Sequence, residues 1–120
     1  MIHALRRLPG RKILFSNGPR QYAEAILDIT GLKACFNAVY SVEKVGYKPK
    51  PMRAGFLALL RAEHLDPRRC IMVEDSLPNL VTAKKLRMRT MWVSTGLRQS
   101  PFVDVKIGSV LQLPGRCARL

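Results

Sequence analysis

The chain has 120 residues, of which 48% are hydrophobic, enough to bury the core of one domain and too many for a disordered protein. Its formal net charge is +13, with 21 Lys and Arg against 8 Asp and Glu, which favours anionic partners. No basic run exceeds two residues and no aromatic residues alternate with them, so we interpret the charge as a solvated basic surface rather than a nucleic-acid-binding one.

The first half of the chain predicts helices and strands in alternation. Residues 2–8 predict a short helix, and the run KILFS at 12–16 predicts a strand that stops at an Asn-Gly-Pro turn signal. A helix is predicted from Arg20 to Gly31, because apolar residues recur there at i, i+3, i+4 and i+7 and glycine commonly closes a helix. The residues of that pattern are Tyr22, Ala25, Ile26 and Ile29. The run AVYSV at 38–42 predicts a second strand.

The second half continues the alternation after the loop EKVGYKPKP. Residues 52–64 predict an amphipathic helix, and CIMVE at 70–74 predicts a third strand. The apolar face of that helix consists of Phe56, Leu59 and Leu60. Another helix is expected to open near Pro78, a residue favoured in the first turn, and to continue to about residue 87. TMWVS at 90–94 predicts a fourth strand, and VDVKI at 103–107 a weaker fifth.

Cysteine usage and hydropathy indicate where in the cell the protein is expected to lie. Cys35, Cys70 and Cys117 are too widely spaced for a zinc site or a disulfide framework, so we predict a reducing, cytoplasmic location. Cys35 and Cys70 lie among apolar residues and are predicted to be small buried hydrophobes. No apolar run reaches the roughly 18 residues that a membrane span needs, so no membrane partner is expected.

Strands that alternate with helices at this spacing predict an α/β fold with a parallel, doubly wound, Rossmann-like sheet in one domain. In such sheets ligands bind beyond the carboxyl ends of the strands. Three polar clusters fall at the carboxyl ends of three of the predicted strands or in the loop that follows. They are Ser16 with Asn17, the loop that carries Lys48 and Lys50, and Glu74 with Asp75. We therefore predict that these clusters converge on one rim of the sheet.

The chemistry of these clusters suits a phosphate group held against a divalent cation. Ser16 can donate a hydrogen bond to a phosphoryl oxygen, and a lysine supplies positive charge where phosphoryl transfer accumulates negative charge. Glu74 and Asp75 offer the oxygen ligands that Mg²⁺ prefers. Two adjacent carboxylates at the end of an apolar strand would otherwise repel each other, which favours the interpretation of this pair as a metal platform.

Each cluster taken alone has a purely structural interpretation. Ser16 and Asn17 are common turn and helix-capping residues, and a lysine at 48 or 50 is an ordinary solvated loop charge. Asp75 with the next residue, a serine, is a plausible helix N-cap. Only the shared rim and the chain order of the three clusters favour a functional site.

The ordered stretches ILFSNGPRQYAEAIL, YKPKPMRAGF and IMVEDSLPNLVTAKKLRMRTMWVS resemble the haloacid dehalogenase (HAD) superfamily of phosphohydrolases, with the pyrimidine 5′-nucleotidase type as the nearest likeness. The likeness covers about residues 5–113 and implies a HAD-like core. Residues 1–120 would then be a partial core domain that has the family's second to fourth motifs and lacks the first motif, the first strand and the cap. The implied ligands are Mg²⁺ and a small phosphate monoester or nucleotide.

The resemblance also implies roles for individual residues. Ser16 matches the second-motif residue that hydrogen-bonds the phosphoryl group, and Asn17 follows it. The third-motif lysine is Lys50, with Lys48 as the alternate because the run KPKP is ambiguous. The implied metal ligands are Glu74 and Asp75, with Asn79 standing where many relatives have a second acid. Arg87 stands where relatives usually have a glycine, which is expected to alter that turn and not the chemistry.

The family's nucleophile is an aspartate in a DxDxT-like motif after a central strand, and this chain has no such motif. The acids on the N-terminal side are Glu24, Asp28 and Glu43, and none follows an apolar strand in that pattern. In the family that strand lies between the strands that end here at Ser16 and Glu74. Without it, either two strand edges stay unpaired or these two strands pair directly, and self-association through exposed edges becomes possible.

We carry three hypotheses for function. The first is a truncated phosphohydrolase derived from a Mg²⁺-dependent pyrimidine 5′-nucleotidase, inactive as an isolated chain because covalent catalysis has lost its nucleophile. The second is a non-catalytic remnant that binds phosphate or a nucleotide. The third, motivated only by the net charge, is a basic nucleic-acid-associated protein. The substrate itself is not predicted, since in the family the cap selects it.

Overall fold

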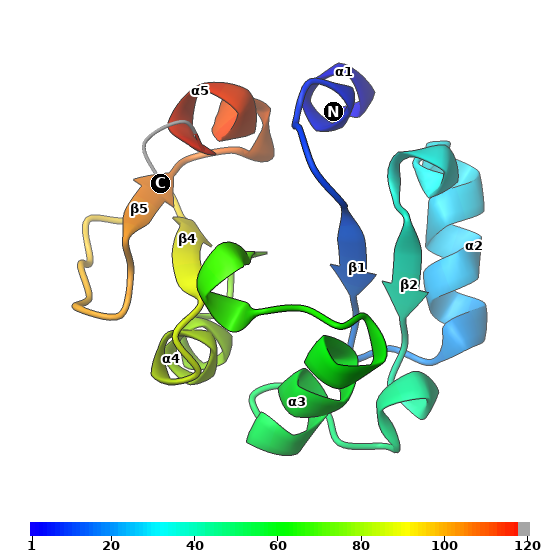
Figure 1. Ribbon diagram of the computed structural model, residues 1–120. Coiled ribbons are helices and arrows are strands. Elements are labelled where there is room, and N and C mark those ends of the chain that lie inside the picture. The colour runs from blue at the N-terminus through cyan, green and yellow to red at the C-terminus, as the bar shows by residue number, and fades with distance from the viewer. Residues whose placement is uncertain (118–120) are drawn as a thin grey trace.

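The computed structural model describes residues 1–117, and the side chain of Cys117 lies outside the described part. The predicted α/β class is confirmed (Figure 1). The helices are α1 (Ile2–Arg6), α2 (Arg20–Thr30), α3 (Arg53–Ala62), α4 (Leu77–Lys85) and α5 (Leu113–Cys117). The strands are β1 (Ile13–Phe15), β2 (Ala38–Tyr40), β3 (Ile71–Glu74), β4 (Arg89–Val93) and β5 (Val105–Ile107). All five predicted strands and the four predicted helices are present, whereas α5 was not predicted.

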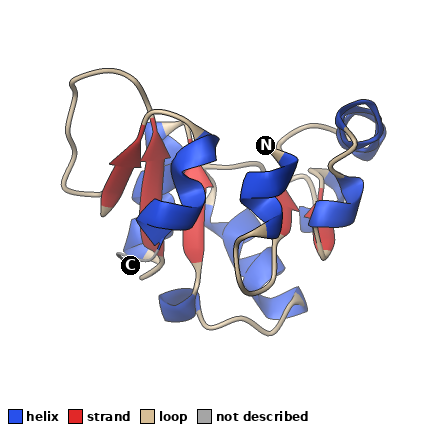
Figure 2. Cartoon of the chain, turned by 90° about the horizontal axis from the view of Figure 1, so that it is seen from above, coloured by secondary structure: helices blue, strands red, loops and turns tan. Residues whose placement is uncertain are grey.

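The strands form two separate parallel sheets rather than one. β1 pairs with β2, with Leu14 opposite Val39, and β4 lies between β3 and β5, with Met72 opposite Thr90. Figure 2 shows the same division, because the strands fall into two groups with helices around them. Among the described residues no strand pairs with the outer edge of β1 or of β3. Of the two alternatives predicted for a sheet without its central strand, the structure has unpaired edges.

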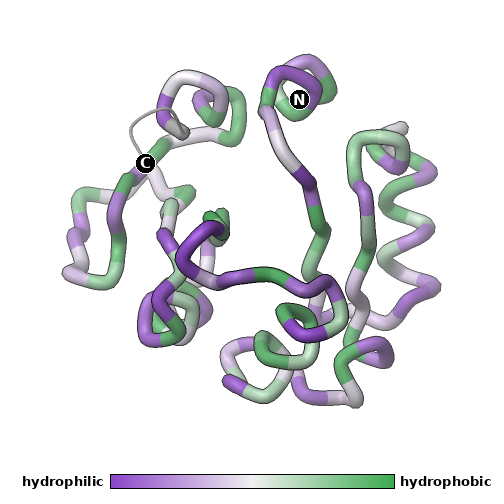
Figure 3. The backbone as a smooth tube through the Cα atoms, viewed as in Figure 1, coloured by the Kyte–Doolittle hydropathy of each residue, from purple (hydrophilic) through white to green (hydrophobic). Residues whose placement is uncertain are grey.

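Helices join the two sheets through a shared core. Phe56 on α3 is 2% exposed and packs with Met72 of β3, while its ring meets Phe15 of β1 edge-on, with centroids 5.3 Å apart and planes at 83°. Figure 3 shows hydrophobic stretches along β1 and within α3. Burial of aromatic rings contributes strongly to stability, so the contact between Phe15 and Phe56 helps to hold the two sheets together.

A second cluster covers the other side of the three-stranded sheet. Its centre is Met91 and Ile107, which are 0% and 2% exposed, and Leu113 of α5 closes it. Leu5 and Leu8, at the N-terminal end of the chain, also pack against this cluster. The three-stranded sheet is therefore covered by helices on both faces, which is the usual requirement of a parallel sheet.

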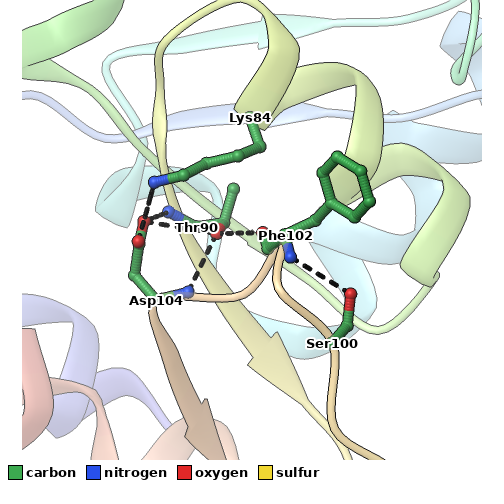
Figure 4. Close-up of polar contacts among 5 residues, drawn as sticks. All are labelled: Lys84, Thr90, Ser100, Phe102 and Asp104. Atoms are coloured by element: carbon green, nitrogen blue, oxygen red, sulfur yellow. Dashed lines mark hydrogen bonds and ion pairs between the residues drawn. The ribbon is translucent and has the colours of Figure 1, made fainter.

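A polar network fastens β5 to β4 (Figure 4). Thr90, fully buried, donates its hydroxyl to the carbonyl of Phe102 at 2.6 Å, and its backbone N–H donates to the Asp104 carboxylate at 2.8 Å. Lys84 Nζ lies 2.7 Å from both oxygens of the same carboxylate. Burial of Asp104 favours a higher pKa, but the hydrogen bonds from Lys84 and Thr90 outweigh it and lower the pKa of this carboxyl.

Helix α2 is the least buried of the longer helices. It ends as predicted at Gly31, whose φ of 70° is left-handed. Its buried residues are Ala23 and Leu27, however, and the apolar pattern that predicts the helix faces outward, with Tyr22 61% and Ile29 83% exposed. The apolar period therefore predicted the helix correctly but not the face that it buries, because α2 covers a sheet of only two strands.

Three smaller expectations also meet the structure. Arg87, predicted to alter a turn where relatives have glycine, has a φ of 72°, a left-handed conformation that costs a residue with a Cβ about 1 kcal/mol or more. Cys35 and Cys70, predicted to be small buried hydrophobes, are only partly buried, and both are free thiols. Within the described residues no helix has the length and apolarity to cross a membrane.

Candidate functional site

The site is built around the side chain of Lys50, which joins the two sheets. Its Nζ donates to the carbonyl of Phe15 at the end of β1 at 2.8 Å and lies 3.0 Å from Glu74 Oε2 at the end of β3. The Lys50 side chain is 7% exposed and that of Glu74 is 12% exposed. The ammonium also lies 5.0 Å from the centre of the Phe15 ring. The predicted convergence of strand ends therefore occurs, with a buried ion pair at its centre.

Asn17 holds the backbone of the lysine loop in place. Its side-chain Nδ2 donates to the carbonyl of Lys50 at 3.0 Å, and its Oδ1 accepts from the Lys50 N–H at 2.8 Å. These two bonds form a closed pair between the turn after β1 and the loop after β2. Asn17 therefore positions Lys50, whereas the resemblance implied only that it comes after the phosphate-binding serine.

Two further contacts, from α3 and α4, hold the loop that carries Lys50. A Cβ added to Gly55 in α3 would lie 2.1 Å from the carbonyl oxygen of Lys48, so only glycine allows the loop to pack this closely on the helix. Thr82 of α4 donates its hydroxyl to the carbonyl of Pro51 at 2.6 Å. Sequence reasoning missed both residues. A glycine inside a predicted helix was the available signal for the first.

Glu74 is committed on both of its carboxylate oxygens. Oε2 faces Lys50, and Oε1 accepts a hydrogen bond from Asn79 Nδ2 at 3.0 Å. Asn79 is itself 7% exposed, near the start of α4. A buried carboxylate held in this way satisfies its charge inside the protein, so Glu74 and Asn79 serve here to orient Lys50.

Asp75 has the opposite character. Its backbone carbonyl accepts a hydrogen bond from Trp92 Nε1 at 2.9 Å, which anchors the residue at the end of β3. Its side chain is exposed, and in the described part of the chain its carboxylate makes no hydrogen bond or ion pair. Of the adjacent acids, one is therefore buried and paired, and the other points to solvent with a free carboxylate.

Ser16 and Lys48 complete the predicted set. The Ser16 backbone N–H donates to Tyr40 at 2.8 Å, and its Oγ accepts from the Gly18 N–H at 3.0 Å, which leaves the hydroxyl proton available to donate. Lys48 is exposed and is not part of the ion pair with Glu74. The geometry thus favours Lys50 over Lys48 as the lysine of the rim.

A second ionisable group of interest is the Tyr40 hydroxyl, at the end of β2. It donates to the carboxylate of Glu63, which also pairs with Arg11. Burial and this hydrogen bond raise the pKa of Tyr40 to about 12, and the hydrogen bond from Tyr40 holds the pKa of Glu63 below its usual value. Tyr40 therefore stays neutral, which suits a packing role rather than proton transfer.

Among the predicted metal ligands, only Asp75 has a free carboxylate that could bind Mg²⁺. Mg²⁺ is commonly held by one or two carboxylates, with substrate oxygens and water completing its shell, and Asp75 meets that requirement. The oxygens of Glu74 already face Lys50 and Asn79. The described residues contain no group of three or more His, Cys, Asp or Glu side chains that could hold a metal. The ligand role predicted for Glu74 and Asn79 stays a prediction.

Two open, mainly apolar hollows lie elsewhere on the surface. One is lined by residues of α3 and the turn after it, from Leu57 to Pro67, and the other by residues 1–3 with Thr30 and Leu32. Neither includes a residue of the rim. We base the site on the contacts of Lys50, because those contacts bring charged groups together and the hollows do not.

The comparisons with known proteins point in one direction. A family model described as haloacid dehalogenase-like hydrolase matches residues 1–87. The chain is 30% identical over 107 residues to hexitol phosphatase B of Escherichia coli K12, covering 86% of this chain and 48% of that protein. The chain thus spans about half the length of the curated relatives it matches.

Solved structures show the same fold. The chain is similar to the HAD phosphatase from Thermococcus onnurineus at 27% identity and a TM-score of 0.79, covering 97% of this chain and 54% of that one. It also aligns with L-2-haloacid dehalogenase from Xanthobacter autotrophicus at 20% identity and a TM-score of 0.84, covering 98% of this chain and 59% of that one. At that identity the second likeness concerns the fold alone.

Proposed function

The chain belongs to the haloacid dehalogenase-like hydrolase family, and from that premise we propose that its rim is the phosphate-binding part of a phosphohydrolase site. The observation that carries the proposal is the buried ammonium of Lys50, held between Phe15 and Glu74, with an exposed, free carboxylate on the next residue, Asp75. A fixed positive charge with a free anionic ligand next to it suits a phosphate monoester that is bound together with a cation.

Each residue of the rim has a distinct task in this proposal. Lys50 would attract the phosphoryl oxygens, and the Ser16 hydroxyl would donate a hydrogen bond to one of them. Asn17 and Glu74 keep the ammonium in position, because they hold the backbone and the charge of Lys50 respectively. Asp75 would hold Mg²⁺, which supplies positive charge to the phosphate oxygens when bound.

The isolated chain is expected to bind without hydrolysing. Covalent phosphoryl transfer in this family requires an aspartate nucleophile, and the two carboxylates of the rim are committed, one to Lys50 and one to the proposed cation. The non-catalytic binder remains the alternative function. It is favoured by this same lack of a spare carboxylate at the rim.

Two substrate classes are proposed for comparison. The E. coli relative's name favours a hexitol phosphate, and the sequence resemblance favours a pyrimidine 5′-monophosphate. Both present a phosphate monoester on a polar body. The substrate-selecting part of the site is not among the residues of the rim. We therefore propose only that the rim binds the phosphate group, and binding measurements will rank the hexitol and the nucleoside as the rest of the ligand.

Calorimetry with UMP and with a hexitol phosphate, each with and without Mg²⁺, tests the proposal. We expect Mg²⁺-dependent binding of at least one ligand that Lys50→Met abolishes. The matched control is Lys48→Met, which removes an equal charge from the same loop and should leave binding intact. Asp75→Asn should remove the dependence on Mg²⁺. Equal losses in the two lysine variants would reduce the effect to net charge and refute the site.

A phosphatase assay on the same proteins tests the lack of turnover. The expected result is no release of phosphate above the level of the Lys50→Met variant. Hydrolysis that Asp75→Asn abolishes would show that the chain carries its own nucleophile, contrary to the proposal.

A further inference from the structure

Three residues of the three-stranded sheet lie side by side near its carboxyl edge. Glu74 of β3 is in register with Trp92 of β4, and Trp92 is in register with Lys106 of β5. Residues in register on neighbouring strands direct their side chains to the same face of a sheet. Glu74, Trp92 and Lys106 therefore form one row across the three strands, and the row begins at the ion pair between Glu74 and Lys50.

Trp92 is the centre of this row and is only 7% exposed. It packs in the apolar cluster that contains Met72 of β3 and, from α4, Leu80 and Ala83. A buried indole still needs an acceptor for its N–H group. That acceptor is the backbone carbonyl of Asp75, 2.9 Å from Nε1. The indole thus connects the apolar core with the residue of the rim whose carboxylate is free.

The backbone at Asp75 leaves a strand and enters a helix within a very short turn. β3 ends at Glu74 and α4 begins at Leu77. Ser76, at the N-cap of α4, makes no side-chain capping hydrogen bond, although serine commonly makes one at this position. The hydrogen bond from Trp92 therefore gives this turn a side-chain anchor that its own N-cap residue does not supply.

Lys106 contacts the face of the same ring. Its Nζ lies 5.1 Å from the centre of the Trp92 ring, and an ammonium in this position is attracted by the electrons of the indole. The ammonium also donates to the carbonyls of Gly96 and Arg98 in the loop after β4. The ring is thus held by the apolar cluster and by Lys106 in the orientation in which its N–H meets Asp75.

The position of the acceptor favours a role at the rim over a purely structural one. A buried N–H group is satisfied by any carbonyl within reach. Here the carbonyl belongs to the residue that carries the free carboxylate, and the backbone of that residue decides where the carboxylate lies. Groups that orient a metal ligand by hydrogen bonds strongly affect the affinity of the metal site.

We propose that Trp92 is a positioning residue, whose indole N–H fixes the backbone of Asp75 and so holds its carboxylate ready for a divalent cation. The inference rests on the proposed function, because the cation is the one proposed to bind together with the phosphate group. Removal of a hydrogen-bonded neighbour of a metal ligand typically lowers metal affinity about 10- to 100-fold. Since Trp92 acts on the backbone of Asp75 rather than on its carboxylate, we expect a loss near the lower value.

The test exploits the fact that Trp92 is the single tryptophan of the chain. Production with benzothienylalanine in place of tryptophan exchanges the indole N–H for sulfur and keeps both rings. We expect this protein to bind Mn²⁺, an oxygen-seeking probe counted by electron paramagnetic resonance, about tenfold more weakly than the native chain does. Calorimetry with inorganic phosphate and no metal should give equal affinities, because Lys50 and Ser16 are unchanged.

Three variants separate the N–H group from the general stability of the sheet. Trp92→Phe also lacks the N–H and should show the same loss of Mn²⁺ affinity with unchanged phosphate affinity. Lys106→Met keeps the N–H and should lose less. Leu86→Ala loosens the same apolar cluster at the far end of α4, so it should lower the melting temperature and keep the Mn²⁺ affinity.

A general structural effect would give a different pattern. A parallel loss of phosphate affinity in the benzothienylalanine protein would overturn the proposal. So would a loss of Mn²⁺ affinity in Lys106→Met or Leu86→Ala as large as the loss in that protein.

Asp75→Asn distinguishes this inference from the proposed function. It keeps the carbonyl that accepts from Trp92 and removes the charge, so it should abolish Mn²⁺ binding. Equal Mn²⁺ binding by the native chain and Asp75→Asn would refute the cation site, and the role of Trp92 would fall with it. If Asp75→Asn loses Mn²⁺ while the benzothienylalanine protein binds it as tightly as the native chain, the proposed function stands and the positioning role of Trp92 is refuted.

Discussion

The two halves of the molecule are built by the same βα alternation and differ in how completely they are buried. In the three-stranded half, Leu80, Ala83, Thr90 and Met91 are all 0% exposed. In the two-stranded half, all three residues of β1 are only partly buried and α2 exposes its apolar stripe. Three strands with helices on both faces make a self-sufficient core, whereas two strands are marginal in water. The two-stranded half therefore depends on contacts with its neighbour.

Two of those contacts are the Phe15–Phe56 ring pair within the core and the bridge from Lys50 to Phe15 and Glu74 at the rim. The rim is thus both the candidate site and a contact that holds the two halves together. We call the bridge from Lys50 to Phe15 and Glu74 the joint. A change that weakens the joint should affect β1 and β2 more than β3 to β5, and substitutions in each half can test that difference.

The largest effect is expected from Phe56→Ala. It removes a ring that is 2% exposed and that contacts both halves, and such truncations cost about 3–5 kcal/mol of unfolding free energy. Urea denaturation monitored by circular dichroism measures the loss. Phe102→Ala, on the partly buried loop before β5, is the matched control and should cost less. Similar losses in both variants would contradict a special role for Phe56 in joining the halves.

The polar network of the three-stranded half should give stability that depends on pH. Asp104 has a lowered pKa in the folded protein, so its contribution is present above the pKa of the unfolded chain, about 4, and is lost as pH falls through the lower folded value. Asp104→Asn should cost about 1–3 kcal/mol at neutral pH and flatten the acid limb of the stability curve. Denaturant titrations at several pH values measure this.

Lys84→Met serves as the control for that network, because it removes the ion pair and leaves the bonds from Thr90 to Asp104. It should lose less stability than Asp104→Asn loses at neutral pH. An acid limb that Asp104→Asn leaves unchanged would show that other carboxyl groups govern the acid response.

Gly55→Ala should act mainly on the joint. The added Cβ would approach the Lys48 carbonyl to 2.1 Å, which forces the loop that carries Lys50 to move. We expect a loss of about 1–3 kcal/mol and weaker binding of the phosphate ligand. Gly115→Ala, where the added Cβ meets no atom within 4 Å, is the control. Unchanged binding in Gly55→Ala would mean that the close packing does not position Lys50.

The smallest effect, and the only gain, is expected from Arg87→Gly. Glycine adopts the left-handed φ of 72° without steric cost, although it loses more entropy on folding, so a net gain of about 0.5–1 kcal/mol is expected. Thermal unfolding measures it, and Arg87→Ala, which keeps a Cβ, is the control. If alanine and glycine stabilise equally, charge removal rather than backbone strain is the cause.

Much of the fold and part of the site were accessible from the sequence. The strand positions, the cap at Gly31 and the buried face of α3 are set by short-range patterns, and the structure confirms them. The order of polar residues after successive strands likewise predicted that Lys50 and Glu74 would meet. The pairing of Asn79 with Glu74 and of Thr82 with Pro51 had no signal, because a side-chain hydrogen bond that depends on tertiary packing leaves no periodicity.

The amino-acid sequence by itself determined the elements, their order, the glycine stops and the rim on which the polar clusters gather, because these depend on local backbone preferences and on the direction of parallel strands. Only the tertiary structure decided that α2 turns its apolar stripe outward, that one acid of the pair at 74 and 75 is buried against Lys50 while the other is free, and that two strand edges stay unpaired among the described residues. Those outcomes depend on which surfaces the rest of the chain supplies to cover each element, and no local pattern records that.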